Sequence, residues 1–178
     1  MRILFISDIH GVKTNLDVIK NYEYDTLVIL GDLYHNGYED SNEFDNAYIK
    51  DFIMNNRSKI ICTKGNCDNS YDFIDLNLPV NDDYIKITDD GLNIYCSHGH
   101  RYNYRNLSYL GTAGVIIYGH EHVPSINNFN DVTYICVGSI SKPRYGSLPS
   151  FCIYEDKKFT IYAVTGKVID SIAIKKHF

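Results

Sequence analysis

The feature that most constrains this chain is a repeated pattern in which a short apolar run is followed at once by residues of metal-binding type. The runs cover 3–6, 26–30, 59–63, 92–97 and 114–118. The residues that follow them are Asp8, His10, Asp32, Asn66, His98, His120 and His122. Apolar runs of this length predict buried strands. Ligands of open α/β sheets bind beyond the carboxyl ends of the strands, so the pattern predicts one shared site.

Asp8 and His10 show how such a strand end works. In an extended chain, residues i and i+2 project to the same side, so the two side chains can reach one point together. An oxygen donor and a nitrogen donor placed in this way suit a divalent metal. Taken alone, the pair is equally consistent with a solvated turn, and the later strand ends are what favour a metal site.

The order of predicted elements indicates an α/β protein. Strands are predicted over residues 2–7, 26–30, 59–63, 84–88, 92–97, 114–118, 125–129, 133–137, 150–154, 158–163 and 167–174. Helices are predicted over 14–21, 43–55 and 102–110, and the second has Phe44, Ala47, Tyr48 and Phe52 near one face. The alternation up to residue 63 predicts βαβ units and a parallel sheet. We expect two packed mixed sheets with helices outside.

Length and composition bound the class of protein. A chain of 178 residues is expected to form a single domain over 1–178. The formal net charge of -5 argues against sequence-independent nucleic-acid binding, which needs a basic surface. The five cysteines form no CxxC pair, which predicts a reducing, cytoplasmic setting. We expect no signal peptide and no membrane segment, because the first residues lead directly into a strand and no apolar run is long enough to span a bilayer.

Taken together and in this order, the motifs resemble those of the calcineurin-like metallophosphoesterase superfamily. They are Asp8-x-His10, Gly31-Asp32, Gly65-Asn66-Cys67-Asp68, His98-Gly99-His100 and Gly119-His120-x-His122. The compact length and the Gly-Asn-Cys-Asp form are most similar to its small bacterial and archaeal phosphodiesterase branch. The resemblance covers residues 1–149, and it implies a four-layer α/β/β/α sandwich of two mixed β-sheets flanked by helices.

The resemblance also implies a ligand set and a reaction. Asp8, His10 and His122 would hold one metal, Asn66, His98 and His120 a second, and Asp32 would bridge both. Asp32, Asn66 and His98 would act in catalysis through the metals, which we expect to be manganese, with nickel, iron or zinc as alternatives. The implied activity is hydrolysis of a small phosphodiester by a metal-bridging hydroxide. A homo-oligomer is implied as well.

Counting charges favours a diester over a monoester. Two divalent cations with Asp8 and Asp32 leave two positive charges, which a hydroxide and a diester monoanion neutralise. A monoester dianion would leave the cluster negative, unless a cationic side chain reverses the preference. The alternatives are a phosphomonoesterase or nucleotide pyrophosphatase on the same site, or a non-catalytic scaffold of the same fold. A scaffold would be expected to lack some of the seven ligands.

Three residues beside the ligands are candidates for supporting roles. Cys67 stands where many superfamily members carry a histidine that protonates the leaving oxygen. Asp68 either orients a metal ligand or caps a turn at 69–73. His100 either contacts the substrate or a ligand, or is a partly exposed loop residue.

Cations and aromatic residues outside these motifs give further candidates. Arg101, Arg105 and Arg144 are of a type that binds phosphate through paired hydrogen bonds, with an ordinary surface charge as the alternative. The tyrosines placed for stacking on an aromatic substrate are Tyr34, Tyr38, Tyr102, Tyr104 and Tyr145.

Overall fold

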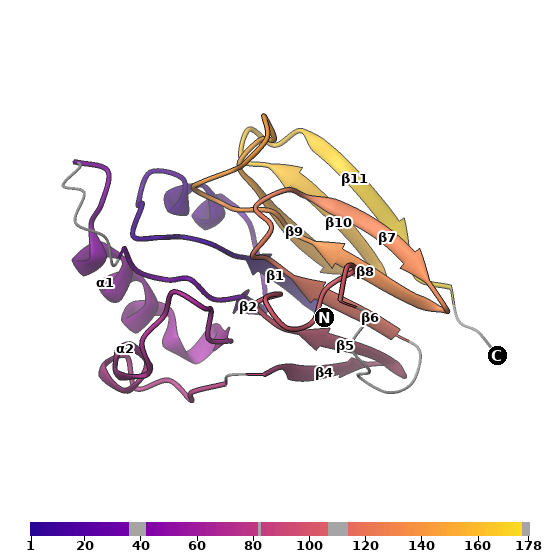
Figure 1. The fold of residues 1–178 in the computed structure, drawn as a ribbon, viewed down its shortest axis with the longest axis horizontal. Helices are drawn as coiled ribbons and strands as arrows, with labels where there is room; N and C mark the ends of the chain where they lie inside the picture. Colours follow the sequence, from indigo (N-terminus) through magenta and orange to yellow (C-terminus); the bar gives the residue numbers. More distant parts are fainter. Residues whose placement is uncertain (36–41, 82, 107–113, 176–178) are drawn as a thin grey trace.

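The computed structural model describes residues 1–35, 42–81, 83–106 and 114–175, and within them two β-sheets pack face to face (Figure 1). The first sheet has the strand order β11-β10-β9-β1-β2-β3, and the second has the order β4-β5-β6-β8-β7. The first contains β1 (Arg2–Ile6), β2 (Thr26–Ile29), β3 (Ile60–Cys62), β9 (Ser150–Glu155), β10 (Lys158–Ala163) and β11 (Val168–Ala173). The second contains β4 (Ile85–Asp89), β5 (Leu92–Cys96), β6 (Gly114–Tyr118), β7 (Ser125–Phe129) and β8 (Val132–Cys136).

Both sheets are mixed, which confirms the expected α/β class with two packed mixed sheets. Among the described residues, helices cover the six-stranded sheet alone, so the second helical layer of the expected α/β/β/α sandwich is not seen there. In the first sheet, β1, β2 and β3 are parallel, and β9 runs antiparallel to β1. In the second, β5, β6 and β8 are parallel, while β4 and β7 lie antiparallel at the two edges. The carboxyl ends of the parallel strands in each sheet therefore lie along one edge of that sheet.

The apolar runs form strands because both faces of the sheets find apolar partners. Ile3 and Phe5 of β1 point into the core between the two sheets. Leu4 and Ile6 point the other way, into the core beneath the helices. This burial on both sides explains why the central parallel strands are continuous apolar runs and not alternating ones.

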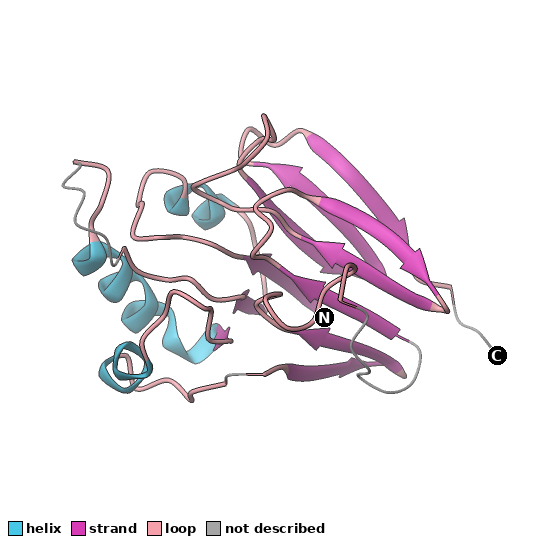
Figure 2. Ribbon diagram, in the orientation of Figure 1, coloured by secondary structure: helices cyan, strands magenta, loops and turns pink. Residues whose placement is uncertain are grey.

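The helices of the described residues lie beside the six-stranded sheet (Figure 2). They are α1 (Asn46–Asn56), α2 (Ser70–Asp75) and the short 3-10 helices η1 (Leu16–Asn21) and η2 (Arg57–Lys59). None of them is long and apolar enough to cross a membrane.

Helix α1 begins three residues later than the predicted 43–55. Phe44 forms an isolated β-bridge with Val12, and the Asp45 carboxylate accepts a hydrogen bond from the amide of the third helical residue. This cap fixes the start of the helix. The buried residues of α1 are Ile49, Phe52 and Ile53. Of the predicted face, Phe52 is buried and Tyr48 packs partly buried against the same core, whereas Ala47 is exposed and Phe44 lies before the helix.

Two other helix predictions also need correction. The predicted helix over 14–21 is the shorter 3-10 helix η1. Residues 101–106 form bends, and the rest of the predicted helix over 102–110 lies outside the described residues. The Asn103 side chain accepts hydrogen bonds from the amides of Arg105 and Asn106. An asparagine that bonds the following amides in this way competes with helix formation.

The core between the sheets provides a test of this packing. Phe5 is fully buried there, with its ring 6.4 Å from that of Phe159. We expect Phe5→Ala to lower the free energy of unfolding by about 3–5 kcal/mol, because it removes a large side chain and leaves a cavity. Phe129→Ala is the matched control, since that ring is 42% exposed at the end of β7. Urea denaturation that gave equal losses for both variants would contradict the assignment of Phe5 to the core.

Candidate metal centre

The structure brings the seven predicted side chains together at the carboxyl ends of β1, β2, β3, β5 and β6. Backbone hydrogen bonds hold neighbouring strand ends in place. The Asp8 amide donates to the Gly31 carbonyl at 3.1 Å, and the His10 amide donates to the Asp32 carbonyl at 2.9 Å. In the second sheet, the Gly119 amide donates to the His98 carbonyl at 2.8 Å. The site is therefore built on the ends of both sheets.

The backbone at these strand ends is strained. Positive φ angles occur at Asp8, His10, Asp32, His120 and His122, with values of 55°, 47°, 55°, 61° and 60°. Residues other than glycine rarely adopt this region, and such strain clusters at functional sites. The left-handed turns point these side chains back across the ends of the strands.

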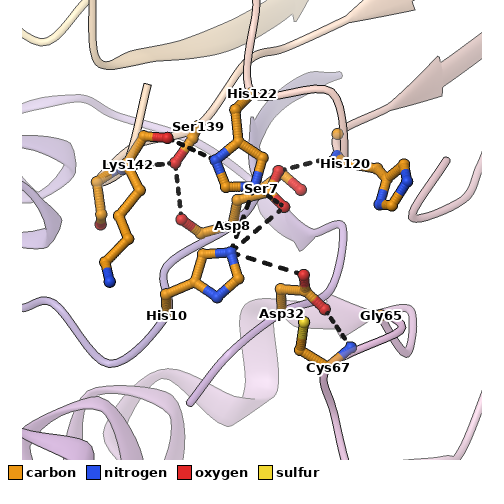
Figure 3. A network of polar contacts seen from close by, with 12 residues as sticks. Ser7, Asp8, His10, Asp32, Gly65, Cys67, His120, His122, Ser139 and Lys142 are labelled. Atoms are coloured by element: carbon orange, nitrogen blue, oxygen red, sulfur yellow. Dashed lines mark hydrogen bonds and ion pairs between the residues drawn. The ribbon is translucent and has the colours of Figure 1, made fainter. Parts of the chain in front are cut away.

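Asp8, His10 and His122 form the first group of donors. The His122 Nε2 lies 3.2 Å from Asp8 Oδ1, and the His10 Nε2 lies 3.8 Å from the same oxygen. The two Nε2 atoms are 3.4 Å apart. Figure 3 shows the His10 ring turned toward Asp8, His122 and Asp32.

Asn66, His98 and His120 form the second group. The His98 Nε2 lies 2.9 Å from the Asn66 side-chain oxygen and 3.3 Å from the His120 Nδ1. Asp32 connects the two groups through a single oxygen. Its Oδ2 lies 3.6 Å from the His10 Nε2 and 3.4 Å from the His98 Nε2.

Backbone carbonyls fix which nitrogen of two histidines faces the site. The His98 Nδ1 donates to the Leu30 carbonyl at 2.7 Å, and the His122 Nδ1 donates to the Lys142 carbonyl. A carbonyl oxygen can only accept, so each neutral ring presents the lone pair of its Nε2 to the site. This is the orientation in which histidine binds a metal, with its other nitrogen held by an outer partner.

The donor atoms fit a divalent cation. Asp8 Oδ1 is buried and accepts no hydrogen bond, although His122 Nε2 is near. A buried carboxylate oxygen without a partner is costly unless a positive charge lies beside it. Nitrogen and oxygen ligands bind such ions at about 2.0–2.2 Å, which places neighbouring ligand atoms about 3–3.6 Å apart. Most separations within the two groups fall in or near this range.

The charges of the cluster perturb its titration. Burial alone would raise the pKa of Asp8, but the neighbouring His122 and His98 hold that pKa below its usual range. Burial alone would lower the pKa of His122, but the Asp8 carboxylate raises it above its usual range. Burial lowers the pKa of His10 and of His120, which favours the neutral, ligand-competent form of both rings.

Asp68 holds the Asp32 turn, and this resolves the two alternatives for its role. Its carboxylate accepts hydrogen bonds from the amides of Asp32 at 2.8 Å, Leu33 at 2.7 Å and Gly65 at 2.8 Å. The cap of the following helix is Asn69, not Asp68. Burial raises the pKa of Asp68 despite these three donors.

Cys67 and His100 lie beside the donors. The Cys67 amide donates to Asp32 Oδ1 at 2.9 Å, and its thiol belongs to a cluster with His10 and Asp32 whose ligand atoms lie within 4.8 Å of one another. Burial, with the charge of Asp32, raises the pKa of this thiol to about 11. The His100 ring centroid is 5.5 Å from that of His98, and its buried Nδ1 finds no hydrogen-bond partner among the residues that the structure describes.

Two glycines lie where neighbouring strand ends come close together. A Cβ on Gly65 would collide with the Asp32 carboxylate, and one on Gly119 would collide with the Ser7 hydroxyl. Neither glycine has a positive φ. Their role is to let two strand ends approach closely.

Sequence reasoning missed the contribution of the segment after β8. The Ser139 hydroxyl donates to the Asp8 carbonyl at 2.8 Å and accepts from the Lys142 amide at 2.8 Å. The Lys142 carbonyl accepts the hydrogen bond from His122 Nδ1, and the Lys142 ammonium lies 4.5 Å from the Phe44 ring centroid. The available signal was positional, because this segment follows a strand parallel to β6 and so lies at the same edge.

The remaining predicted cations and tyrosines separate into two sets. Arg101 pairs with Asp83, and Arg105 pairs with Glu121 at 3.5 Å. Tyr34 is 8% exposed and belongs to the core, and Tyr38 lies outside the described residues. Tyr84 contacts Tyr102 edge to face. Arg144, Tyr104 and Tyr145 line a hollow next to His120.

Comparisons with known proteins agree with this geometry. Residues 1–158 match the family model described as the calcineurin-like phosphoesterase superfamily domain. Phosphodiesterase YfcE of Escherichia coli K12 is 26% identical over 181 residues, covering 98% of each sequence. A solved structure of YfcE, described as a phosphoesterase from E. coli, has a TM-score of 0.88 at 27% identity and covers 98% of this chain and 100% of that chain. Vps29 from Entamoeba histolytica complexed with Zn²⁺ has a TM-score of 0.64 at 20% identity, covers 98% and 100%, and shows likeness of fold alone.

The Asp68 contacts yield a test of the site's support. In Asp68→Asn, the side-chain amide keeps one acceptor oxygen but places an NH₂ group against backbone amides that are themselves donors, so at least one of their hydrogen bonds is lost. We expect Asp68→Asn to lower the free energy of unfolding of the metal-free protein by about 1–3 kcal/mol. We also expect it to weaken manganese binding about 10–100-fold, measured by calorimetry, because Asp32 loses its support. Asp51→Asn, on the exposed face of α1, is the control. Unchanged metal affinity in Asp68→Asn would contradict this role.

Proposed function

Because this chain belongs to the calcineurin-like phosphoesterase superfamily, we propose that it hydrolyses a small phosphodiester with the help of two divalent cations. Its similarity to phosphodiesterase YfcE over nearly the full length supports a diester substrate. The observation that carries the proposal is the position of Asp32 Oδ2, which lies within 3.6 Å of His10 and 3.4 Å of His98. One carboxylate oxygen is thus shared by two donor groups, as a centre with cations about 3.5–4 Å apart requires.

The proposed ligands follow the two groups. Asp8, His10 and His122 would hold one cation, and Asp32 would bridge it to the second. Asn66, His98 and His120 would hold the second, and the neutral amide of Asn66 would do so without adding charge. When bound, the cations would polarise the phosphoryl group and lower the pKa of bound water, which supplies a nucleophile near neutral pH.

The chain's own residues contribute preorganisation. Backbone carbonyls lock the rings of His98 and His122, and Asp68 locks the turn that carries Asp32. Side chains held in this way would keep the electrostatic field at the phosphorus in place before substrate binds. Asp8 and Asp32 leave an excess of positive charge on a dinuclear site, which attracts an anionic ester.

The donor types favour manganese, with nickel, iron or zinc as alternatives. Histidine nitrogens and carboxylate oxygens suit all four ions. The Cys67 thiol near His10 and Asp32 adds a soft donor that the sequence interpretation did not include. In the metal-free protein, burial and the charge of Asp32 raise the pKa of this thiol to about 11, and the thiolate, not the thiol, is the form that binds metals.

Two observations bear on the alternatives. A phosphomonoesterase or nucleotide pyrophosphatase on the same site would need extra positive charge to bind a dianion. Lys142 and Arg144 could supply this charge, because they lie close enough to affect the titration of His10 and His122, respectively. A scaffold without catalysis is disfavoured because all seven donors are retained and face one another.

The proposal predicts that the shared carboxylate is indispensable. We expect Asp32→Asn and His98→Ala each to lower kcat for bis(p-nitrophenyl) phosphate by more than about 100-fold. Replacing a metal ligand should reduce activity more than replacing a residue that only supports a ligand, for which losses are about 10–100-fold. The protein should be stripped with a chelator and refilled in turn with manganese, nickel, zinc or magnesium. Asp51→Asn should retain wild-type activity. Near-normal rates in both site variants would remove the two-metal mechanism.

A second prediction concerns the leaving group. Cys67 stands where many superfamily members carry a histidine, and burial raises the pKa of its thiol in the metal-free protein, so we expect the departing oxygen to leave with little help from Cys67. We therefore expect aryl phosphodiesters to react faster than alkyl ones, with a steep dependence of kcat/KM on leaving-group pKa. A series of substituted phenyl methyl phosphodiesters measures the slope. A flat dependence that became steep in His100→Gln would instead assign the proton to His100.

A further inference from the structure

The segment from Ser139 to Gly146 couples the metal centre to a second feature of the molecule. Ser139 and Lys142 attach its first half to Asp8 and His122, as described above. Its second half is attached as well, because the Arg144 amide donates to the His122 carbonyl at 3.2 Å. Side chains that project from this segment therefore have a fixed position relative to the site.

The side chains of Arg144 and Tyr145 project from this segment, and neither has a hydrogen bond or ion pair with another side chain in the described part of the protein. Among the described residues, no carboxylate pairs with the Arg144 guanidinium, in contrast to Arg105, which pairs with Glu121. The Tyr145 side chain is 95% exposed, and its backbone has a positive φ of 52°. An unpaired cation and an exposed aromatic ring on strained backbone are not explained by packing.

Both side chains line a hollow of about 730 Å³ that begins at His120. Its other walls include Tyr104, Arg105 and the polar side chain of Asn127 on β7. The volume is that of a pocket for a small organic molecule and exceeds what one phosphate group needs. Tyr104 is itself held edge to face by Tyr134, with ring centroids 5.7 Å apart, so this wall is preformed.

We propose that this pocket binds a nucleoside portion of the substrate, and that Arg144 binds a second phosphate carried by it. The inference rests on the proposed function, since the pocket adjoins the donor His120. Tyrosine rings stack on nucleobases, an amide such as that of Asn127 can bond to a base edge, and an arginine binds phosphate through paired hydrogen bonds. The substrate class is then a phosphodiester of a nucleotide that bears a further phosphate on the side that does not leave.

The test compares substrates with the same leaving group. They are methyl p-nitrophenyl phosphate, the p-nitrophenyl ester of thymidine monophosphate, and that ester with a second phosphate on the remaining sugar hydroxyl. We expect the second phosphate to raise kcat/KM about tenfold in the wild-type protein, the size of one charge-assisted contact. Arg144→Gln should abolish this gain, measured within each variant as the ratio of kcat/KM for the ester with the second phosphate to kcat/KM for the ester without it. Lys158→Gln removes the same charge at the start of β10, at the opposite end of the sheet, and should keep the gain.

Variants of Tyr145 test the nucleoside part of the proposal independently of Arg144. Tyr145→Ala should reduce the preference for the thymidine ester over the methyl ester, and Tyr145→Phe should preserve it, because stacking does not need the hydroxyl. Binding of thymidine bisphosphate to the metal-free protein, followed by calorimetry, should weaken about tenfold in Arg144→Gln and stay unchanged in Lys158→Gln.

The two proposals fail in different ways. An equal gain from the second phosphate in wild type and Arg144→Gln, or no gain in either, would overturn the pocket assignment while diester hydrolysis stood. If no metal form hydrolysed any of the three esters, the proposed function would fail. The bisphosphate titration would then decide the pocket alone, and equal affinity in wild type and Arg144→Gln would overturn it.

Discussion

Unprotonated histidine nitrogens and buried carboxylate oxygens repel one another when nothing positive lies between them, and the ends of both sheets in this protein are arranged around such a contact. The carbonyls of Leu30 and Lys142 accept hydrogen bonds from the single N–H group of neutral His98 and His122. The lone pair on the other ring nitrogen then faces Asp32 in His98 and Asp8 in His122. A proton on His122 relieves part of the repulsion, as its raised pKa indicates. A divalent cation relieves more, because it accepts several donors at once.

The fold supplies the stiffness that this arrangement requires. Five of the seven donors sit on left-handed backbone, a conformation that persists only where the surroundings determine it. The surroundings here are parallel strands buried on both faces, with their ends tied by cross-strand hydrogen bonds. Gly65 and Gly119 allow neighbouring strand ends to approach closely. The Asp68 carboxylate holds the turn at Asp32 by accepting hydrogen bonds from three backbone amides. Catalytic geometry and core packing are therefore parts of one structure.

The sequence predicted most of this because its strongest signals are local. Apolar runs such as 3–6 and 114–118 identify strands directly, and the position of a donor after each run identifies the edge where it must lie. Helix boundaries were less accurate, since the start of α1 depends on the bridge between Phe44 and Val12, a contact between distant segments. The bends at 101–106 depend on side-chain bonds of Asn103 that compete with a helix. Ser139 and Lys142 carry no motif of their own, so only the strand order shows that they reach Asp8 and His122.

The segment after β8 links two requirements that a phosphodiesterase must satisfy together. Its carbonyl at Lys142 sets the tautomer of His122, and its next residues place Arg144 and Tyr145 over the hollow beside His120. If this hollow binds substrate as proposed, a change of sequence in this segment can alter specificity only within limits that keep His122 in place. Tyr104 and Arg105 lie on another wall of the hollow, and Arg105 pairs with Glu121, the residue between the donors His120 and His122. Both walls are therefore attached to the segment that carries His120 and His122, and if the hollow binds substrate as proposed, specificity and metal binding share that support.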